Sequence, residues 1–516
     1  MYIKNIIENL KKFLNIIKVD FNSIFIWLIF IIISIYILLK SYFWGYYISH
    51  DSSYYLRAAK SILYGNWFYI DKLAGDDKTW FGVWPIGYPF FIALVSYLLG
   101  NIDIYLASKI LSIIIIFFII LIFKIKFKHY AWLFTICLVN SHFLNIFSFT
   151  WSEHLFILGL LCFVLNIFDI ISEKKTNRLN YLFLFLSCLI LFFSRYIGLF
   201  SLIVILFFIL IIFLEQKNLK IKDKDEINKI KYLSFVILLI FIFIILYLFM
   251  NKINSGYITG EPRVKPKETF LELLNQLWIA QKKEFNKVIF SFGGILIIFL
   301  LFDFILNNNI KNLVNNYIKN YKEKLSLYFI FIGFMYWLSI VYLRFVSYFD
   351  PFNYRLLYPA TFLMVIGIIL FFIENNLRFL KLLNYNKIGF IILFIIISLS
   401  LCKSILKQKT NGYLYIKNMT EKKYEIVPSK SKVLWMDRIA YFLRSDVIKI
   451  DVKSLYEINS FDDYINLLGE KNIFIDTENF RELKKRGLIS ISEDVFNKSK
   501  FYSLIKDENI KIIKVK

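Results

Sequence analysis

A carboxylate lies between a histidine and several hydroxyl groups in segment 49–55, Ser-His-Asp-Ser-Ser-Tyr-Tyr. The first long apolar run, 21–39, ends shortly before it, so Asp51 is expected where a membrane-spanning helix emerges. A carboxylate in a partly dry cavity can act as a general base that takes the proton of an attacking hydroxyl. The alternative is a solvated helix cap, since acidic residues are common at that place. We predict Asp51 as catalytic and its neighbour His50 as substrate-binding.

A second carboxylate, Glu153, stands beside His154 at the start of the apolar run 153–171. An acid at a helix N-terminus is also favoured by the helix dipole alone, which leaves a structural interpretation open. The chemical interpretation makes Glu153 the second catalytic residue and His154 a substrate ligand. The two side chains would orient the acceptor or hold a divalent metal, although no ligand spacing requires a metal.

Three arginines are candidates for binding substrate: Arg195 next to Tyr196 between two spans, Arg355 next to Tyr354, and Arg263 in the segment 259–263 of a long loop. We predict these arginines and both tyrosines as substrate ligands. Guanidinium groups bind phosphate and diphosphate through two parallel hydrogen bonds. A single arginine at a membrane interface often only extends to lipid headgroups. Three arginines with two carboxylates nevertheless predict a site for a phosphate-bearing substrate.

The elements that must position these residues are membrane helices. The 516-residue chain is 58% hydrophobic and has a mean hydropathy of +0.60. Its apolar residues gather in runs of about 17–22, the length that crosses ~30 Å of hydrocarbon. The formal net charge of +24 indicates basic cytoplasmic loops rather than nucleic-acid binding. The four cysteines all fall inside apolar runs, so no disulfide framework is expected.

The run 85–99 decides the topology. Pro85, Gly87 and Pro89 at its start suit an element that lies on the membrane better than a span. If it does not span, every basic connection falls on the side of the basic N-terminus, as the positive-inside rule requires. These connections are 124–128, 174–178, 217–231, 311–324 and 378–387. We therefore predict about eleven spanning helices, with the N-terminus cytoplasmic and the candidate residues on the outer face.

The remaining segments are amphipathic or mixed. Residues 51–65 and 268–281 have the spacing of amphipathic helices, with packed loops as the alternative. Residues 410–516 alternate short apolar runs with helical patterns, which predicts a small α/β domain. The predicted division is a transmembrane domain at 1–404, whose outer loop 44–103 is catalytic, and an extracytoplasmic α/β domain at 405–516.

Several of these segments together resemble the GT-C glycosyltransferases, in the branch of protein O-mannosyltransferases and of the aminoarabinose transferases that modify lipid A. The first outer loop is similar in 51–59 (DSSYYLRAA), 65–67 (GNW) and 84–91 (WPIGYPFF). Segments 152–156, 194–199, 259–263 and 354–360 are similar to recurrent motifs of bacterial members. The resemblance implies that the acid of the first outer loop, Asp51 here, is the catalytic base or its organiser.

The resemblance also implies a substrate, a sugar carried on polyprenyl phosphate at the outer face of a plasma or inner membrane. The acceptor hydroxyl could belong to a protein, a lipid or a glycan, and no cofactor is required. A transporter or flippase is the first alternative, against which no series of intramembrane charges or repeated halves is evident. The second alternative is a membrane scaffold without catalytic activity.

Overall fold

The computed structural model describes most of the chain from residue 21 to residue 515. Outside the described residues are 1–20, 72–77, 174–176, 220–222, 261–265, 267, 290–320, 349–350, 376–386, 408–410, 445, 451–461, 463–464, 467–471, 486–504, 506, 508 and 516. Arg263 lies outside them, as do most of the predicted span 287–306 and of the helical pattern 461–468.

The chain forms two compact units. The first contains the described residues of 1–39, 82–88 and 109–408, and the second those of 40–81, 89–108 and 409–516. The predicted boundary at 404/405 therefore divides the chain differently, because most of the first outer loop groups with the C-terminal residues.

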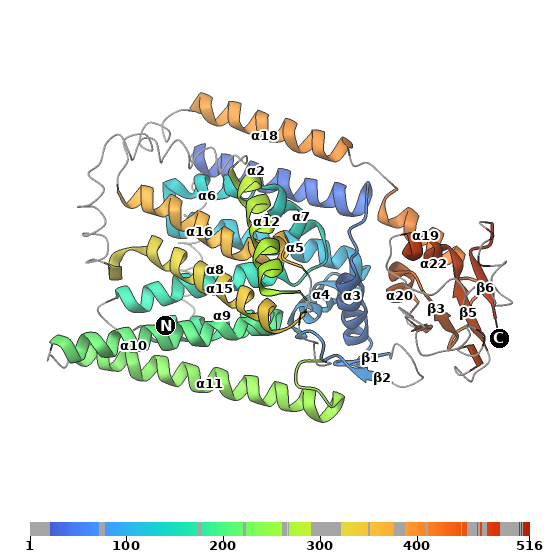
Figure 1. Cartoon of the computed structure of the whole chain (residues 1–516). Coiled ribbons are helices and arrows are strands. Elements are labelled where there is room, and N and C mark those ends of the chain that lie inside the picture. The colour runs from blue at the N-terminus through green and yellow to red at the C-terminus, as the bar shows by residue number, and fades with distance from the viewer. Residues whose placement is uncertain are drawn as a thin grey trace. The chain divides into compact units, whose positions relative to one another are not determined.

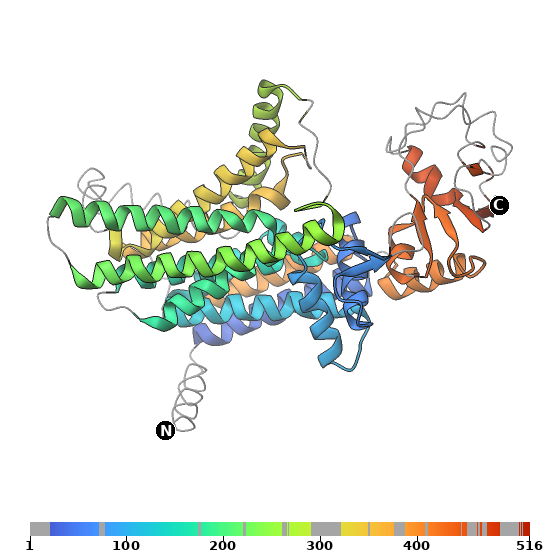
Figure 2. The same cartoon turned by 90° about the horizontal axis from the view of Figure 1, so that it is seen from below.

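The first unit is a helical bundle built around α8. Its helices are α2 (Phe21–Leu38), α5 (Ile104–Phe127), α6 (Ala131–Cys137), α7 (Ser141–Ser148), α8 (Glu153–Ser172), α9 (Arg178–Ser194), α10 (Phe200–Leu219), α11 (Lys224–Ser255), α12 (Phe270–Ile289), α15 (Leu325–Val346), α16 (Tyr354–Glu374) and α18 (Lys387–Lys407). Helix α8 contacts α7, α9, α15 and α16 (Figure 1). Most of its side chains are buried, and Glu153 and His154 at its N-terminal end are fully buried. Helices α10 and α11 lie side by side (Figure 2).

Seven described segments are long and apolar enough to cross a membrane. They are Asn22–Phe43, Ile104–Cys137, Glu153–Ser172, Tyr196–Lys217, Lys224–Ser255, Leu325–Val346 and Tyr354–Glu374. The shorter apolar helices are Gly87–Leu98, Arg178–Ser194 and Ile392–Leu406. The protein is thus a polytopic α-helical membrane protein, as predicted, whereas the number eleven stays a prediction.

The run 129–149 is largely apolar, which predicts one continuous helix, but the structure has two short helices there. It is divided into α6 and α7, because Asn140 caps a new helix by accepting a hydrogen bond from the backbone N–H of His142 at 2.8 Å. Both short helices still contact α2 and α16, so the segment remains within the bundle.

The two predicted amphipathic segments are helices. Helix α12 begins with a capping box, in which Thr269 Oγ1 accepts from the N–H of Glu272 and Glu272 Oε2 accepts from the N–H of Thr269. Leu273 and Leu277 are buried, while Leu271 and Trp278 are exposed. The other segment is α3 (His50–Leu63), in the second unit.

The second unit combines the first-loop segments with a small α/β fold. Its elements are α3, β1 (Tyr69–Asp71), β2 (Lys78–Trp80), most of α4 (Gly87–Leu98), α19 (Tyr413–Lys423), β3 (Lys432–Leu434), α20 (Arg438–Leu443), β4 (Ile448–Ile450), β5 (Ile473–Asp476), α22 (Thr477–Lys485) and β6 (Ile512–Lys514). The sheet has the order β4-β3-β5-β6, with β3 parallel to β4 and β5 and with β6 antiparallel. The predicted α/β fold is confirmed, and the β1–β2 hairpin was not predicted.

The 12 residues of α4 span only about 18 Å at 1.5 Å per residue. That length is too short to cross the ~30 Å of membrane hydrocarbon. The prediction that 85–99 does not form a straight span is therefore consistent with the length of α4.

Candidate active site

Two arginines converge on a single carboxylate at the N-terminal end of α8. The side chain of Glu153 is fully buried, and its Oε1 accepts hydrogen bonds from Nη1 of Arg195 and from Nε of Arg355. No hydrogen-bond partner for Glu153 Oε2 is found among the described residues. The triad formed by Glu153, Arg195 and Arg355 thus joins α8, the α9–α10 turn and α16.

Local sequence explains why the two arginines reach this point. Arg195 follows α9 in an extended conformation, before a short 3₁₀ turn at Tyr196–Leu199. A Cβ atom on Gly198 would lie 2.3 Å from the backbone carbon of Leu191, so the tight return of the chain requires glycine there. Arg355 is in the first turn of α16, and its guanidinium lies 4.4 Å from the ring centroid of Trp151.

The triad carries one negative and two positive charges. Both guanidinium groups share one carboxylate oxygen, so the triad depends on this ion pairing in a buried place. A further buried cation, Lys109, donates to the carbonyl of Ser148 at 2.6 Å and to Oγ1 of Thr150 at 3.1 Å. Lys109 therefore fixes the turn that leads to Trp151 and Glu153.

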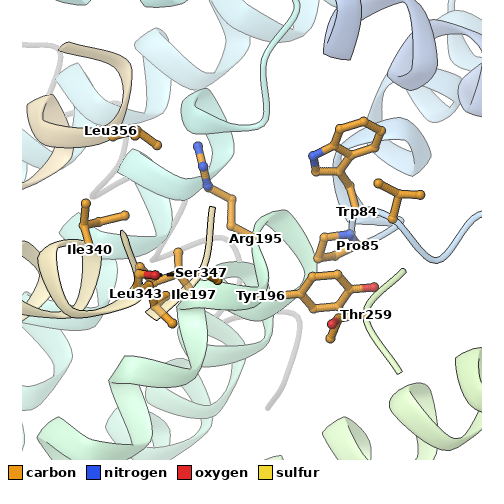
Figure 3. A pocket seen from close by; sticks show the side chains of 11 residues that line it. Trp84, Pro85, Arg195, Tyr196, Ile197, Thr259, Ile340, Leu343, Ser347 and Leu356 are labelled. Atoms are coloured by element: carbon orange, nitrogen blue, oxygen red, sulfur yellow. Dashed lines mark hydrogen bonds between the residues drawn. The ribbon is translucent and has the colours of Figure 1, made fainter. Parts of the chain in front are cut away.

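A cavity of about 260 Å³ opens beside Arg195 (Figure 3). It is lined by Val83, Trp84, Pro85, Arg195, Tyr196, Ile197, Thr259, Ile340, Leu343, Ser347 and Leu356. Three motifs chosen from the sequence, 84–91, 194–199 and 259–263, contribute to this one wall, and Leu356 follows Arg355 directly. The cavity is therefore lined by both apolar and polar side chains and has a guanidinium group at its surface.

Tyr196 holds the walls of this cavity together. Its hydroxyl donates to the carbonyl of Gly82 at 2.7 Å and accepts from Nδ2 of Asn251 at 3.0 Å. Asn251 also donates to the carbonyl of Ile258, next to Thr259. The predicted role of Tyr196 as a substrate ligand stays a prediction, while its hydrogen bonds indicate a supporting role.

We expect Tyr196→Phe to destabilise the fold around the cavity without removing any charge. The substitution leaves the carbonyl of Gly82 and the amide of Asn251 without this partner, which costs about 1–3 kcal/mol if they stay buried. Tyr196→Phe is expected to unfold in detergent at a lower temperature than the wild type. Tyr257→Phe, on the exposed turn nearby, is the control and is expected to unfold close to the wild type. An unchanged unfolding temperature would contradict the supporting role.

His154 faces the interior of the bundle. Its Nε2 lies 2.7 Å from the carbonyl of Ile146, which makes Nε2 the protonated nitrogen, and Ser112 Oγ is 3.0 Å from Nδ1. The ring is stacked on Phe147 and is fully buried. This placement gives His154 a packing role and does not favour the predicted contact with substrate.

Tyr354 is stacked on the ring of His142, with centroids 4.8 Å apart, and is next to Arg355. Asp51 and His50 belong to the second unit, in the first turn of α3, where Ser49 caps the helix by accepting from the N–H of Ser52. The structure therefore brings Glu153, Arg195 and Arg355 together in the first unit, while Asp51 and His50 belong to the second unit.

Sequence reasoning missed two cations of the first unit, Lys109 and Arg344. Arg344 is fully buried and donates to Glu268 Oε1 at 2.6 Å. In the sequence it stands between the cavity residues Leu343 and Ser347. A lysine inside the run 104–123 and an arginine at the end of the run 326–343 were the available signals. Among the described residues, no cluster of three or more His, Cys, Asp or Glu side chains could hold a metal ion.

No protein-family model matches the sequence, and no curated protein matches it. Among solved structures, ArnT from Cupriavidus metallidurans bound to undecaprenyl phosphate superposes with a TM-score of 0.54 at 8% identity, over 90% of this chain and 94% of that one. The oligosaccharyltransferase of Archaeoglobus fulgidus in its apo form superposes with a TM-score of 0.52 at 10% identity, over 87% of this chain and 69% of that one.

The chain has the GT-C fold. The resemblance drawn from the first-loop and arginine motifs is therefore confirmed at the level of fold. At 8–10% identity the match carries no residue roles, so the chemistry must be argued from the side chains of this chain.

Proposed function

We propose that the protein is a glycosyltransferase that uses a sugar carried on polyprenyl phosphate. The observation that supports this most directly is the cavity beside Arg195, where a guanidinium group borders a hollow lined by both apolar and polar side chains. A lipid phosphate presents the matching chemistry, since it combines an anionic head with an apolar tail. The solved relative bound to undecaprenyl phosphate supports the same class of donor.

The tail has a path in this proposal. A second hollow of about 390 Å³ lies between α10 and α15 and is lined by Phe207, Phe208, Ile211, Leu327, Tyr328, Ile330, Phe331 and Phe334. The Arg195 cavity is bordered by Ile197 before α10 and by Leu343 on α15. Helix α15 lines both hollows. Ile197 and Phe207 are ten residues apart, which corresponds to about 15 Å along a helix.

The reaction we propose is a displacement at the anomeric carbon. The Asp51 carboxylate takes the proton of the acceptor hydroxyl, whose oxygen forms a bond to that carbon as the carbon–oxygen bond to phosphate breaks. The phosphate leaves with the electron pair, and the stereochemistry is inverted. Arg195 and Arg355 would stabilise the charge on the leaving phosphate, and Glu153 would hold both guanidinium groups in place.

The sidedness is part of the proposal. We place the N-terminus in the cytoplasm and the chemistry, with the C-terminal α/β domain, on the outer face of a plasma or inner membrane. The acceptor is left open among proteins, lipids and glycans. Release of polyprenyl phosphate from a radiolabelled lipid-linked sugar, dependent on acceptor, is the test; transport of the intact lipid without release would instead favour a flippase.

We expect Arg195→Gln to weaken binding of polyprenyl phosphate about 10- to 100-fold, because a hydrogen bond to a charged group is worth about 1.5–3 kcal/mol. Equilibrium binding of the phosphate in detergent would measure it. Lys252→Ala is a suitable control, since that exposed lysine donates to its own turn at Gly256. Equal affinities of Arg195→Gln and wild type would exclude Arg195 as a phosphate ligand.

We expect Ile211→Trp to fill part of the α10–α15 hollow and to weaken long-chain donors selectively. A phosphate with only one or two isoprene units does not reach this hollow, so its affinity is expected to stay at the wild-type value. Equal losses for short and long chains would contradict the proposed path of the tail.

A further inference from the structure

The C-terminal α/β fold packs against the helix that carries Asp51. Both belong to the second unit, in which α20 contacts α3. The contacts involve Tyr54, Arg57 and Lys60, which are three residues apart in sequence and therefore share one side of α3. Asp51 lies one turn before Tyr54 on the same helix.

Arg57 is the central contact. It is 1% exposed, its Nη1 donates to the carbonyl of Tyr441 at 2.9 Å, and its guanidinium lies 4.1 Å from the Tyr441 ring centroid. Lys60 Nζ donates to the carbonyl of Leu443 at 2.9 Å, at the C-terminal end of α20. Carbonyl groups at that end lack partners within the helix, so Lys60 satisfies one of them.

A column of rings continues from Tyr441 to the first turn of α3. The rings of Tyr441 and Tyr54 have centroids 5.2 Å apart, and those of Tyr54 and His50 are 5.0 Å apart. His50 precedes Asp51 directly. A side chain of the C-terminal fold is thus connected, through two ring contacts, to the neighbour of the proposed base.

We infer that the C-terminal fold braces α3 and that Tyr441 is a positioning residue for Asp51. The inference rests on the proposed function, in which Asp51 takes the proton of the acceptor. Helix α3 has 14 residues, and isolated helices of about 12–15 residues are marginal in water, so its order depends on packing. A shift of about 1 Å at a catalytic group can reduce a rate about 100-fold, so loss of the brace would act on the chemical step.

The test compares Tyr441→Ala with the conservative Tyr441→Phe, which keeps the ring. In the sugar-transfer assay we expect Tyr441→Ala to lower kcat about 10- to 100-fold, with the KM for the lipid donor unchanged. Tyr441→Phe should retain most of the wild-type kcat. Glu478→Gln is the matched control, because the half-exposed Glu478 pairs with Lys423 at 2.8 Å within the C-terminal fold.

Hydrogen–deuterium exchange of the α3 amides supplies a measurement that does not need activity. Faster exchange at residues 50–63 in Tyr441→Ala, but not in Tyr441→Phe or Glu478→Gln, would support the brace. Unchanged exchange in Tyr441→Ala would overturn it, whatever the kcat. If the wild-type protein transfers no sugar, the proposed function fails, and the exchange result alone decides whether Tyr441 braces α3.

Discussion

Replacing Glu153 with alanine is expected to destabilise the bundle by about 3–5 kcal/mol, because two guanidinium groups would lose their shared carboxylate in a buried place. Both arginines bond to the same oxygen, Oε1, so the substitution removes both contacts at once. Glu153→Gln keeps the shape and one accepting oxygen but removes the charge, so a smaller loss is expected. Thermal or denaturant unfolding in detergent would measure both.

Asp169→Asn provides a control on the same helix. Asp169 pairs with Lys126 at 2.5 Å near the other end of α8, and both side chains are partly exposed. Exposed ion pairs contribute about 0–1 kcal/mol, so this variant is expected to unfold close to the wild type. If Glu153→Ala were no less stable than Asp169→Asn, the triad would not be the energetic centre of this end of the bundle.

The helix boundaries near the triad could be read from the sequence. The end of one apolar run at Ser194 and the start of another at Glu153 are where the structure has them. These boundaries depend on local features, such as a charged residue between two apolar runs and an asparagine before Tyr354 that caps α16. The break at Asn140 uses the same kind of cap, but continuous hydropathy on both sides concealed it.

The partners of Glu153 could not be read in the same way. They lie 42 and 202 residues away in sequence, and only the packing of α8 against α9 and α16 brings them to one oxygen. The same holds for Tyr441, which lies 384 residues from Arg57. The sequence predicts three arginines on one face, which stays a prediction, and which of them share a carboxylate depends on contacts between distant segments.

Replacing Asp51 with asparagine is expected to reduce sugar transfer about 100- to 10,000-fold, because general-base catalysis contributes that much. An amide cannot accept the proton of the acceptor hydroxyl, while it keeps nearly the same volume in the first turn of α3. Ser49 still caps the helix through the N–H of Ser52, so α3 is expected to form. Binding of polyprenyl phosphate should stay near the wild-type affinity, since the proposed phosphate ligands are arginines.

The structural alternative makes a different prediction for the same variant. An acid in the first turn of a helix interacts favourably with the helix dipole, by about 0.3–1 kcal/mol. If Asp51 is only a cap, Asp51→Asn would therefore lower the stability slightly and leave sugar transfer nearly intact. Added formate separates the two in Asp51→Ala, because a small carboxylate can enter the space left by the truncated side chain and take the proton in its place. Transfer by Asp51→Ala that recovers with formate, when the isosteric Asp51→Asn does not recover, would support the base. Near-normal transfer by Asp51→Asn without formate would remove that role and leave Asp51 as a helix cap.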